Sequence, residues 1–333
     1  MTPAEDEGTV RTGGSDARAQ RLRAAWLYFA HGLTQRDVAA RLGVSRSTVI
    51  RLLDDARARR EVRIWIDADE ARCIRLGVQL EQHLGLGRAI VVPGADGAAD
   101  AHTTARAVGL ALGRHLSGLV RPGMRIGVGW GRTLEASLEA FRPPRCPGTR
   151  VLALLGGTLA PVAVNPVDHA WRLAEALGGD CHLFPAPLIV DSPETRRRLV
   201  EACGLSRLFA MAEGLDLAVL SVGEAGAGAT SLTAGLIGAG EMAGLVEAGA
   251  VGDVMCWFLD REGRVVDHPL TDRVMAVPLS TIRGARQRVL ATGGAHRGAA
   301  IRAATAAIAA DTLITDEPAA EALLRLAPLT AAH

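Results

Sequence analysis

The chain has 333 residues, 49 % of them hydrophobic, and its 37 basic residues nearly balance its 36 acidic ones, for a net charge of +1. No apolar stretch approaches the roughly 20 uncharged residues of a membrane helix, so we expect no membrane partner. Every basic residue is an arginine, which excludes Schiff-base chemistry on a lysine. The five cysteines are scattered singly, as is typical of reduced thiols in the cytoplasm and not of a disulfide framework or a zinc site. We expect no metal and no cofactor.

The first 67 residues are predicted to contain a small all-α domain. Residues 1–16 are polar and glycine-rich, which predicts a disordered lead-in. Residues 17–67 are the predicted DNA-binding domain, which begins with a helix over 18–31. The side chains expected to point into its core are Leu22, Trp26 and Phe29. Residues 62–66 alternate only partly between apolar and polar side chains, which predicts a short strand or wing.

Residues 33–53 have the pattern of a helix-turn-helix. Thr34 can cap the first helix, with Asp37 as its capping-box partner, and Ser45 can cap the second. Gly43 supplies the turn between the two helices. The apolar faces consist of Val38, Ala39 and Leu42 on the first helix, and of Val49, Leu52 and Leu53 on the second. With those faces buried, the first residues of the second helix are free to meet base edges.

Charge distinguishes this motif from an ordinary helical hairpin. Between residues 18 and 63 there are eleven arginines and four acidic residues, so this segment carries +7 and the rest of the chain −6. A basic head on an acidic body is typical of a DNA-binding module joined to a domain that does not bind DNA. The predicted partner is double-stranded operator DNA, and the candidate contacts are Thr34, Gln35, Arg41, Ser45, Arg46, Ser47, Thr48 and Arg51. Arg46, Ser47 and Thr48 are expected to reach bases. Arg41 and Arg51 are expected to touch phosphates.

The remainder of the chain has the pattern of an α/β domain. Residues 68–88 contain a predicted helix over about 70–84, which is either a connector or a dimer-forming helix. From 89 to 330, short apolar runs alternate with helical patterns, which indicates a mostly parallel sheet covered on both faces. Strands are expected over 89–92, 124–128, 151–155, 182–184, 217–222, 254–259, 274–279, 289–291 and 312–314. Helices are expected over 100–119, 133–141, 166–177, 194–203, 240–247, 295–309 and 318–326.

Four glycine-bearing loops follow predicted strands, where the ligands of such sheets bind. In the first, residues 127–133, the glycines let backbone N–H groups approach a phosphate at a helix start. Its spacing is G-x-G-x-G rather than G-x-G-x-x-G, and the next strand ends without an acidic residue, so NAD binding is not expected.

Glycines and arginines in these loops suit a phosphate, and acids and hydroxyls suit sugar hydroxyls. The candidate effector-binding residues are Gly127, Gly129, Trp130, Gly131, Arg132, Thr133, Gly156, Gly157, Thr158, Asn165, Asp253, Asp272, Arg273, Gly293, Gly294 and Arg297. For Asp272 and Arg273, a structural ion pair is an equally good explanation. Residues 223–240 are predicted to form a mobile loop near the site.

Several longer motifs occur in a fixed order along the chain. In the head they are residues 26–29, 32–35 and 42–49, and in the body residues 126–133, 185–188, 249–253 and 313–317. Together they resemble the SorC-type sugar-responsive bacterial transcriptional regulators, which are sometimes grouped with the DeoR-like regulators. The similarity extends from about residue 24 to residue 324.

This resemblance implies an effector domain for a sugar or phosphosugar, related to sugar-phosphate isomerases and glucosamine-phosphate deaminases, and assembly into homodimers or homotetramers. Two positions depart from the family pattern. Members often carry lysine where this chain has Arg297, which can bind a phosphate bidentately but cannot form an imine. Members usually have glycine where this chain has Arg60, near the end of the recognition helix.

The sequence therefore predicts a helix-turn-helix domain, winged or not, followed by an α/β effector domain. The expected protein is a cytoplasmic, nucleoid-associated regulator of carbohydrate metabolism that is not an enzyme. The alternative is a sugar-phosphate isomerase or deaminase fused to a DNA-binding head, with Asp253 as its base. His268 and His296 are its candidate companions, although their spacing is not convincing. A constitutive architectural protein is a third class, disfavoured by the large ligand-suited body.

Overall fold

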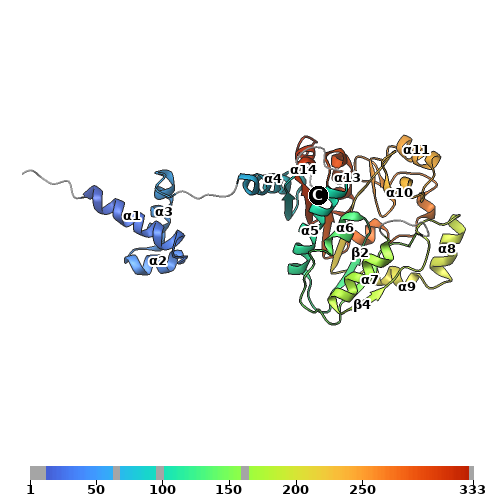
Figure 1. Ribbon diagram of the computed structural model, residues 1–333, viewed down its shortest axis with the longest axis horizontal. Helices are drawn as coiled ribbons and strands as arrows, with labels where there is room; N and C mark the ends of the chain where they lie inside the picture. The colour runs from blue at the N-terminus through green and yellow to red at the C-terminus, as the bar shows by residue number, and fades with distance from the viewer. Residues whose placement is uncertain (1–12, 63–67, 95–100, 159–164, 330–333) are drawn as a thin grey trace, which may run out of the picture. The chain divides into compact units, whose positions relative to one another are not determined.

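A computed structural model describes residues 13–62, 68–94, 101–158 and 165–329 (Figure 1). The chain divides into two compact units, the head (Met1–Asp67) and the body (Ala68–His333), and each is described by itself. The first helix begins at Gly13, so the end of the predicted lead-in is helical, and residues 1–12 lie outside the described part. Within the described ranges, no helix is long and apolar enough to cross a membrane.

The head contains the predicted helix-turn-helix. Its helices are α1 (Gly13–Phe29), α2 (Gln35–Leu42) and α3 (Arg46–Ala58). Thr34 accepts the N–H of Asp37, and the Asp37 carboxylate accepts the N–H of Thr34, which completes the capping box of α2. Ser45 caps α3 by accepting the N–H of Thr48. Gly43 follows α2 with a φ of 66°, a left-handed conformation that glycine adopts without strain. The predicted caps and turn are confirmed.

The buried face of α1 differs from the prediction. Ala24, Ala25 and Leu27 are buried, whereas Leu22 is exposed and Trp26 is 58 % exposed. Because α1 packs on both α2 and α3, alanines on its inner face let the helix backbones approach closely. The expectation that the largest apolar side chains point inward is therefore wrong for Leu22 and Trp26.

A two-pronged ion pair joins α1 to the residues after α3. Arg21 donates from Nε and Nη2 to the two carboxylate oxygens of Glu61 at 2.6 and 2.7 Å. These hydrogen bonds lower the pKa of the Glu61 carboxyl. The preceding residue, Arg60, has a φ of 56°, which is the conformation that a glycine would adopt at lower cost. Val62 is half-buried, and the rest of the predicted strand or wing lies outside the described residues.

A seven-stranded sheet forms the centre of the body, and every neighbouring pair of its strands is parallel. The strand order is β1-β10-β9-β5-β2-β3-β4. The strands are β1 (Arg88–Val92), β2 (Arg125–Val128), β3 (Arg150–Ala153), β4 (Asp180–His182), β5 (Leu217–Leu220), β9 (Gln287–Ala291) and β10 (Thr312–Asp316). The predicted, mostly parallel α/β architecture is confirmed.

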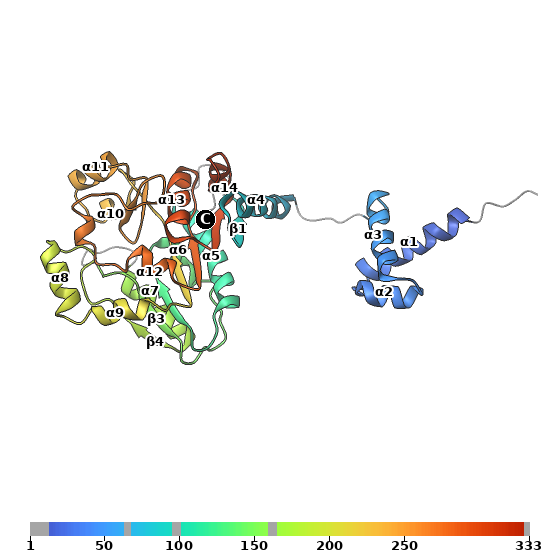
Figure 2. The same cartoon turned by 180° about the vertical axis from the view of Figure 1, so that it is seen from behind.

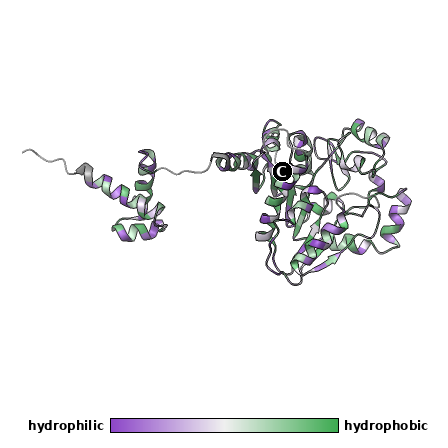
Figure 3. Cartoon of the chain, in the orientation of Figure 1, coloured by the Kyte–Doolittle hydropathy of each residue, from purple (hydrophilic) through white to green (hydrophobic). Residues whose placement is uncertain are grey.

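Helices cover this sheet, and their alternating hydrophobic and hydrophilic positions give them the striped appearance of Figure 3. The helices of the body are α4 (Ala68–Leu84), α5 (Ala101–Leu119), α6 (Arg132–Ser137), α7 (Pro166–Leu177), α8 (Pro193–Glu201), α9 (Ser206–Ala212), α10 (Thr230–Thr233), α11 (Ala239–Glu247), α12 (Leu279–Arg283), α13 (Gly298–Ile308) and α14 (Glu317–Leu324). α4 packs on β1 and α14 (Figure 2). Leu80 of α4 is fully buried, whereas Ile74 and Val78 are exposed. The segment 68–88 is therefore built into the same compact unit as the sheet.

Two predicted strands take other forms. Residues 254–259 belong to a hairpin in which β7 (Gly252–Val254) pairs with β8 (Trp257–Leu259), and β6 (Gly223–Glu224) completes a small antiparallel sheet. The hairpin turn has positive φ at both Met255 and Cys256, and without the usual glycine or asparagine it leaves no sequence signal. Residues 274–279 make only isolated bridges before α12 begins.

Close packing of α5 on α6 positions the loop that follows β2. A Cβ on Gly113 of α5 would clash with the Ser137 carbonyl oxygen of α6, whereas a Cβ on Gly118 would meet nothing within 4 Å. Glycine is thus required at position 113, whereas at position 118 it only lowers the helix propensity of α5.

We expect Gly113→Ala to lower the free energy of unfolding by about 1–3 kcal/mol, because the added methyl overpacks the contact between α5 and α6. Gly118→Ala is the matched control in the same helix, and it should raise stability by about 0.5–1 kcal/mol. Urea unfolding of both variants measures the difference. Equal effects of the two substitutions would contradict the packing argument.

Candidate functional site

The start of α3 presents the predicted DNA-contacting side chains in two groups. Arg46 and Ser47 are exposed, and Arg46 Nε donates to Gln35 Oε1 at 3.3 Å, which links the start of α3 to the start of α2. The Thr48 hydroxyl is half-buried and lies 2.8 Å from the Ser45 hydroxyl. Thr48 therefore serves the helix cap together with Ser45. The Ser47 hydroxyl also lies 2.8 Å from that of Ser45, but Ser47, like Arg46, is exposed and can reach a base.

The acidic residues of the head leave one group of arginines without ion pairs. Glu61 pairs with Arg18 and Arg21, and Asp54 pairs with Arg57. Among the described residues of the head, no acidic partner lies within ion-pair distance of the remaining exposed arginines on α2 and α3, which are Arg36, Arg41, Arg46 and Arg51. Their charge is available to phosphates.

In the body, the strand order creates a switch point between β2 and β5. The chain runs from β2 outward through β3 to β4, and then returns to β5 on the other side of β2. Loops that leave two neighbouring strands in opposite directions open a crevice at their carboxyl ends. A cavity of about 500 Å³ lies there, a size typical of small-molecule sites.

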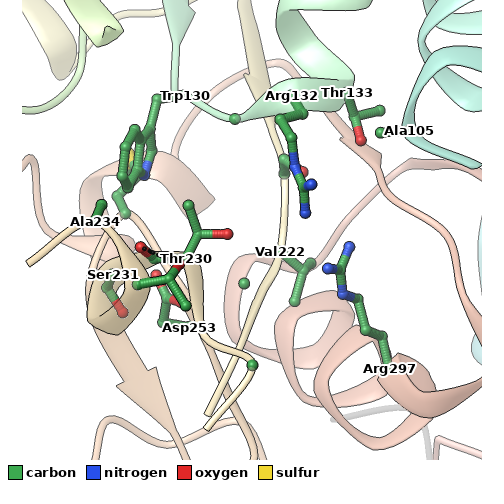
Figure 4. A pocket seen from close by; sticks show the side chains of 16 residues that line it. Ala105, Trp130, Arg132, Thr133, Val222, Thr230, Ser231, Ala234, Asp253 and Arg297 are labelled. Carbon is green, nitrogen blue, oxygen red and sulfur yellow. Dashed lines mark hydrogen bonds between the residues drawn. The ribbon is translucent and has the colours of Figure 1, made fainter. Parts of the chain in front are cut away.

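Three groups of residues line this cavity (Figure 4). The loop after β2 contributes Trp130, Gly131, Arg132 and Thr133, and the loop after β5 contributes Ser221, Val222 and Gly223. Facing them are Ala105, Gly228, Thr230, Ser231, Thr233, Ala234, Asp253, Met255 and Arg297. An arginine end and a hydroxyl-rich end can be distinguished in Figure 4, with the guanidinium groups of Arg132 and Arg297 on one side and Trp130, Thr230, Ser231 and Asp253 on the other.

Two buried polar atoms in the cavity wall have no hydrogen-bond partner in the part of the chain that the structure describes. They are Nε of Arg297 and the hydroxyl of Ser231. Only 12 % of the Arg297 side chain is exposed, and burial, with a contribution from nearby Arg132, lowers the pKa of its guanidinium. An unpartnered buried polar group costs free energy that a ligand atom can recover. These two atoms therefore support a polar, anionic occupant.

Asp253 forms the floor of the hydroxyl-rich end. Its Oδ2 accepts the Cys256 N–H at 2.8 Å, across the turn in which Met255 and Cys256 have positive φ. Burial raises the pKa of the Asp253 carboxyl to about 6, although the Cys256 N–H and the charge of Arg297 oppose the shift. Gly223 packs directly on this carboxylate, leaving no room for a Cβ. Asp253 thus holds a strained turn and faces the ligand space.

The cavity contains six of the sixteen predicted effector residues, namely Trp130, Gly131, Arg132, Thr133, Asp253 and Arg297. Gly127 and Gly129 are packed against leucines in the core. Gly156 and Gly157 bond to neighbouring backbone, and Asn165 caps α7 and lies 3.5 Å from the Thr158 carbonyl. Arg273 pairs with Glu241, and Asp272 is exposed. The structure does not place these residues in the lining of the cavity, and glycine at a strand end also serves tight packing.

Gly293 and Gly294 support the cavity without lining it. Asp316 at the end of β10 accepts the Gly294 N–H at 2.9 Å and also caps α14. A Cβ on Gly293 would lie 2.9 Å from the Asp316 carboxylate. This arrangement fixes the loop that carries Arg297. Asp316 was not among the candidate site residues, although Asp-Glu-Pro is a recognisable helix start.

The residues that the prediction missed come mostly from the segment 223–240. It was expected to be a mobile loop near the site, and it contains β6 and α10, with Thr230, Ser231 and Thr233 facing the cavity. Its glycine- and alanine-rich sequence carries no periodic signal for a four-residue helix. The hydroxyl cluster in Ala229–Ala234 was the one available clue.

Comparisons with known proteins give one family match for the head and one for the body. Residues 69–325 match the family described as "Putative sugar-binding domain", and residues 15–64 match a homeodomain-like domain. The erythritol catabolism regulatory protein EryD of Brucella abortus (strain 2308) is 33 % identical over 91 % of this chain and 95 % of its own length. The transcriptional regulator LsrR of Enterobacter sp. (strain 638) is 30 % identical over 92 % of both chains.

A solved structure shows the same fold over both units. The full-length sorbitol operon regulator SorC from Klebsiella pneumoniae superimposes with a TM-score of 0.71, covering 93 % of this chain and all of that one, at 24 % sequence identity.

The buried Asp253 carboxyl predicts a pH-dependent effect of its substitution. Because its pKa is about 6 in the folded protein and about 3.9 when unfolded, the folded state binds the extra proton, and stability falls as pH rises through this interval. Asp253→Asn removes the charge and keeps an oxygen for the Cys256 N–H. Its unfolding free energy relative to the original protein should increase by about 2 kcal/mol between pH 4 and pH 7. Urea unfolding at several pH values tests this, and a difference independent of pH would contradict it.

Proposed function

We propose, from the premise that this chain belongs to the SorC-type family of sugar-responsive transcriptional regulators, that a small sugar or phosphosugar binds the cavity of the body and thereby controls operator binding by the head. The observation that carries the proposal is the cavity at the β2/β5 switch point, where Arg132 and Arg297 face one space and buried polar atoms of Arg297 and Ser231 lack partners. A ligand that binds one conformation better shifts the population toward it.

The two ends of the cavity suit two parts of such a ligand. A phosphate at the arginine end would accept bidentate hydrogen bonds from Arg132 and Arg297. Sugar hydroxyls at the other end would meet Asp253, Ser231 and Thr230, and the ring of Trp130 offers an apolar surface to one face of the sugar. α6 has only six residues, so we assign anion binding to the Arg132 side chain rather than to the helix dipole.

For the head, we propose that Arg46 and Ser47 reach base edges and that Arg41 and Arg51 bind phosphates. Two-fold operators require two heads, so we also propose a homodimer or homotetramer that binds a pseudo-palindrome with half-sites about one helical turn, or a multiple of it, apart. The exposed Ile74 and Val78 of α4 make this helix the candidate contact between copies.

The enzyme alternative rests on Asp253, whose raised pKa suits a general base. Neither candidate companion lines the cavity. His268 accepts the Leu270 N–H, and His296 pairs with Glu224. We therefore propose binding without turnover. Turnover of a sugar phosphate that is lost in Asp253→Asn would favour the enzyme.

Phosphate contacts in the head predict a change in the salt dependence of DNA binding. Arg51→Ala should weaken binding to a random-sequence duplex and flatten the slope of log K against log salt by about one unit. Arg57→Ala is the matched control on the same helix, because Arg57 already pairs with Asp54 and lies 5.3 Å from the Phe29 ring centre. An unchanged slope in Arg51→Ala would exclude Arg51 as a phosphate contact.

Ligand binding to the body predicts stabilisation of the folded protein. In thermal unfolding against a panel of free and phosphorylated sugars, the ligand at a hundredfold excess over its Kd should add about 2.7 kcal/mol of stability. Arg132→Ala should abolish the shift. Asp272→Ala, at an exposed residue outside the cavity, should retain it. No shift with any sugar, or equal shifts in Arg132→Ala, would contradict the proposed site.

A further inference from the structure

Glu224 follows the cavity-lining Gly223 and contacts both basic residues of the loop after β9. Its Oε2 is 3.2 Å from His296 Nε2, and its Oε1 is 3.8 Å from Arg297 Nη2. The next turn of chain passes so close that a Cβ on Gly228 would lie 2.8 Å from Glu224 Oε1. The carboxylate is therefore enclosed by backbone on one side and by His296 and Arg297 on the other.

Arg297 is held only loosely by this carboxylate. At 3.8 Å the contact is an ion pair without a hydrogen bond. Among the residues that the structure describes, the Arg297 side chain makes one hydrogen bond, a long one of 3.5 Å from Nη1 to the Gly293 carbonyl, and its buried Nε has no partner. Arg132 across the cavity adds repulsion. The guanidinium thus has N–H donors that are not used in hydrogen bonds, and Glu224 is the acidic residue nearest to it.

We propose that Glu224 is an internal counter-anion that occupies Arg297 in the empty cavity, and that the anionic group of the effector must displace it. After displacement, Glu224 retains His296, and Arg297 turns its free donors to the ligand. This inference rests on the proposed function, because it specifies which effectors the same cavity accepts.

The consequence is selection for a phosphate ester. A carboxylate on the effector would replace the single negative charge of Glu224 by another single charge at Arg297, so the exchange adds little binding free energy. A phosphate carries about −1.5 to −2 charges at pH 7 and three acceptor oxygens, so it can bridge Arg297 and Arg132 together. A neutral sugar cannot compensate either arginine. Glu224 therefore disfavours uncharged and singly charged ligands relative to phosphorylated ones.

The test is titration of the full-length protein with inorganic phosphate, followed by calorimetry. Glu224→Gln keeps the shape and removes the charge, so phosphate should bind about two- to fivefold more tightly, the range expected for loss of a partly exposed ion pair. Glu241→Gln is the matched control, because it removes a glutamate paired with Arg273 away from the cavity and should leave phosphate affinity unchanged. Gln at that position also keeps a side-chain oxygen that accepts the Gly238 N–H at the start of α11.

His296→Ala provides a second variant at an exposed side chain. It leaves Glu224 with Arg297 alone, so phosphate binding should weaken, and the same change in the Glu224→Gln background should have no effect. Unchanged or weaker phosphate binding by Glu224→Gln, including no binding by either protein, would overturn the proposal. Failure of the proposed function is distinguished by the sugar panel, in which Arg132→Ala would then respond like the original protein.

Discussion

The reversal of strand order between β2 and β5 is the constraint on which the ligand site depends. It directs the loop after β2 and the loop after β5 away from each other, so the carboxyl edge of the sheet opens at that point. Arg132 and Gly223, which are far apart in the chain, then line one space. The outer wall is supplied by α10 and by the β7–β8 turn, and α13 packs against both strands of that hairpin.

Several features that are energetically unfavourable for the folded state are concentrated around the cavity. Met255 and Cys256 have left-handed backbone conformations, Asp253 is a buried carboxyl, and the polar atoms of Ser231 and Arg297 lack partners. Surroundings that are themselves well packed can hold such features, and they cluster where a protein binds or reacts. Here the surroundings are the fully buried strands of the parallel sheet and the Asp316 carboxylate, which fixes the Gly293–Gly294 loop.

In the head, the ion pairs decide which arginines are available to a nucleic acid backbone. Glu61 and Asp54 neutralise arginines of α1 and of the end of α3, and the side-chain caps of Thr34 and Ser45 hold the starts of α2 and α3. The arginines of α2 and the first turns of α3 keep their charge for another partner. The segregation of acids and bases, more than the total charge of +7, makes one surface suitable for a nucleic acid backbone.

The sequence by itself determined the features that act over a few residues. Thr34, Gly43 and Ser45 could be recognised because a cap or a left-handed turn needs only a side chain and the adjacent backbone. The parallel sheet could be recognised because a strand covered on both faces is apolar throughout. The arginines of the cavity were found for a related reason, since they stand beside glycines at strand ends.

Tertiary structure alone decided what depends on distant neighbours. Trp26 is exposed because alanines on α1 meet the other helices of the head, and Gly156 serves packing because residues 186–187 pass beside it. Thr230 and Ser231 reach the cavity only through the path of the 223–240 segment, and Glu224 meets Arg297 because the strands that precede them, β5 and β9, are neighbours in the sheet. Contacts between residues more than 70 positions apart are set by strand order and packing, which no local pattern encodes.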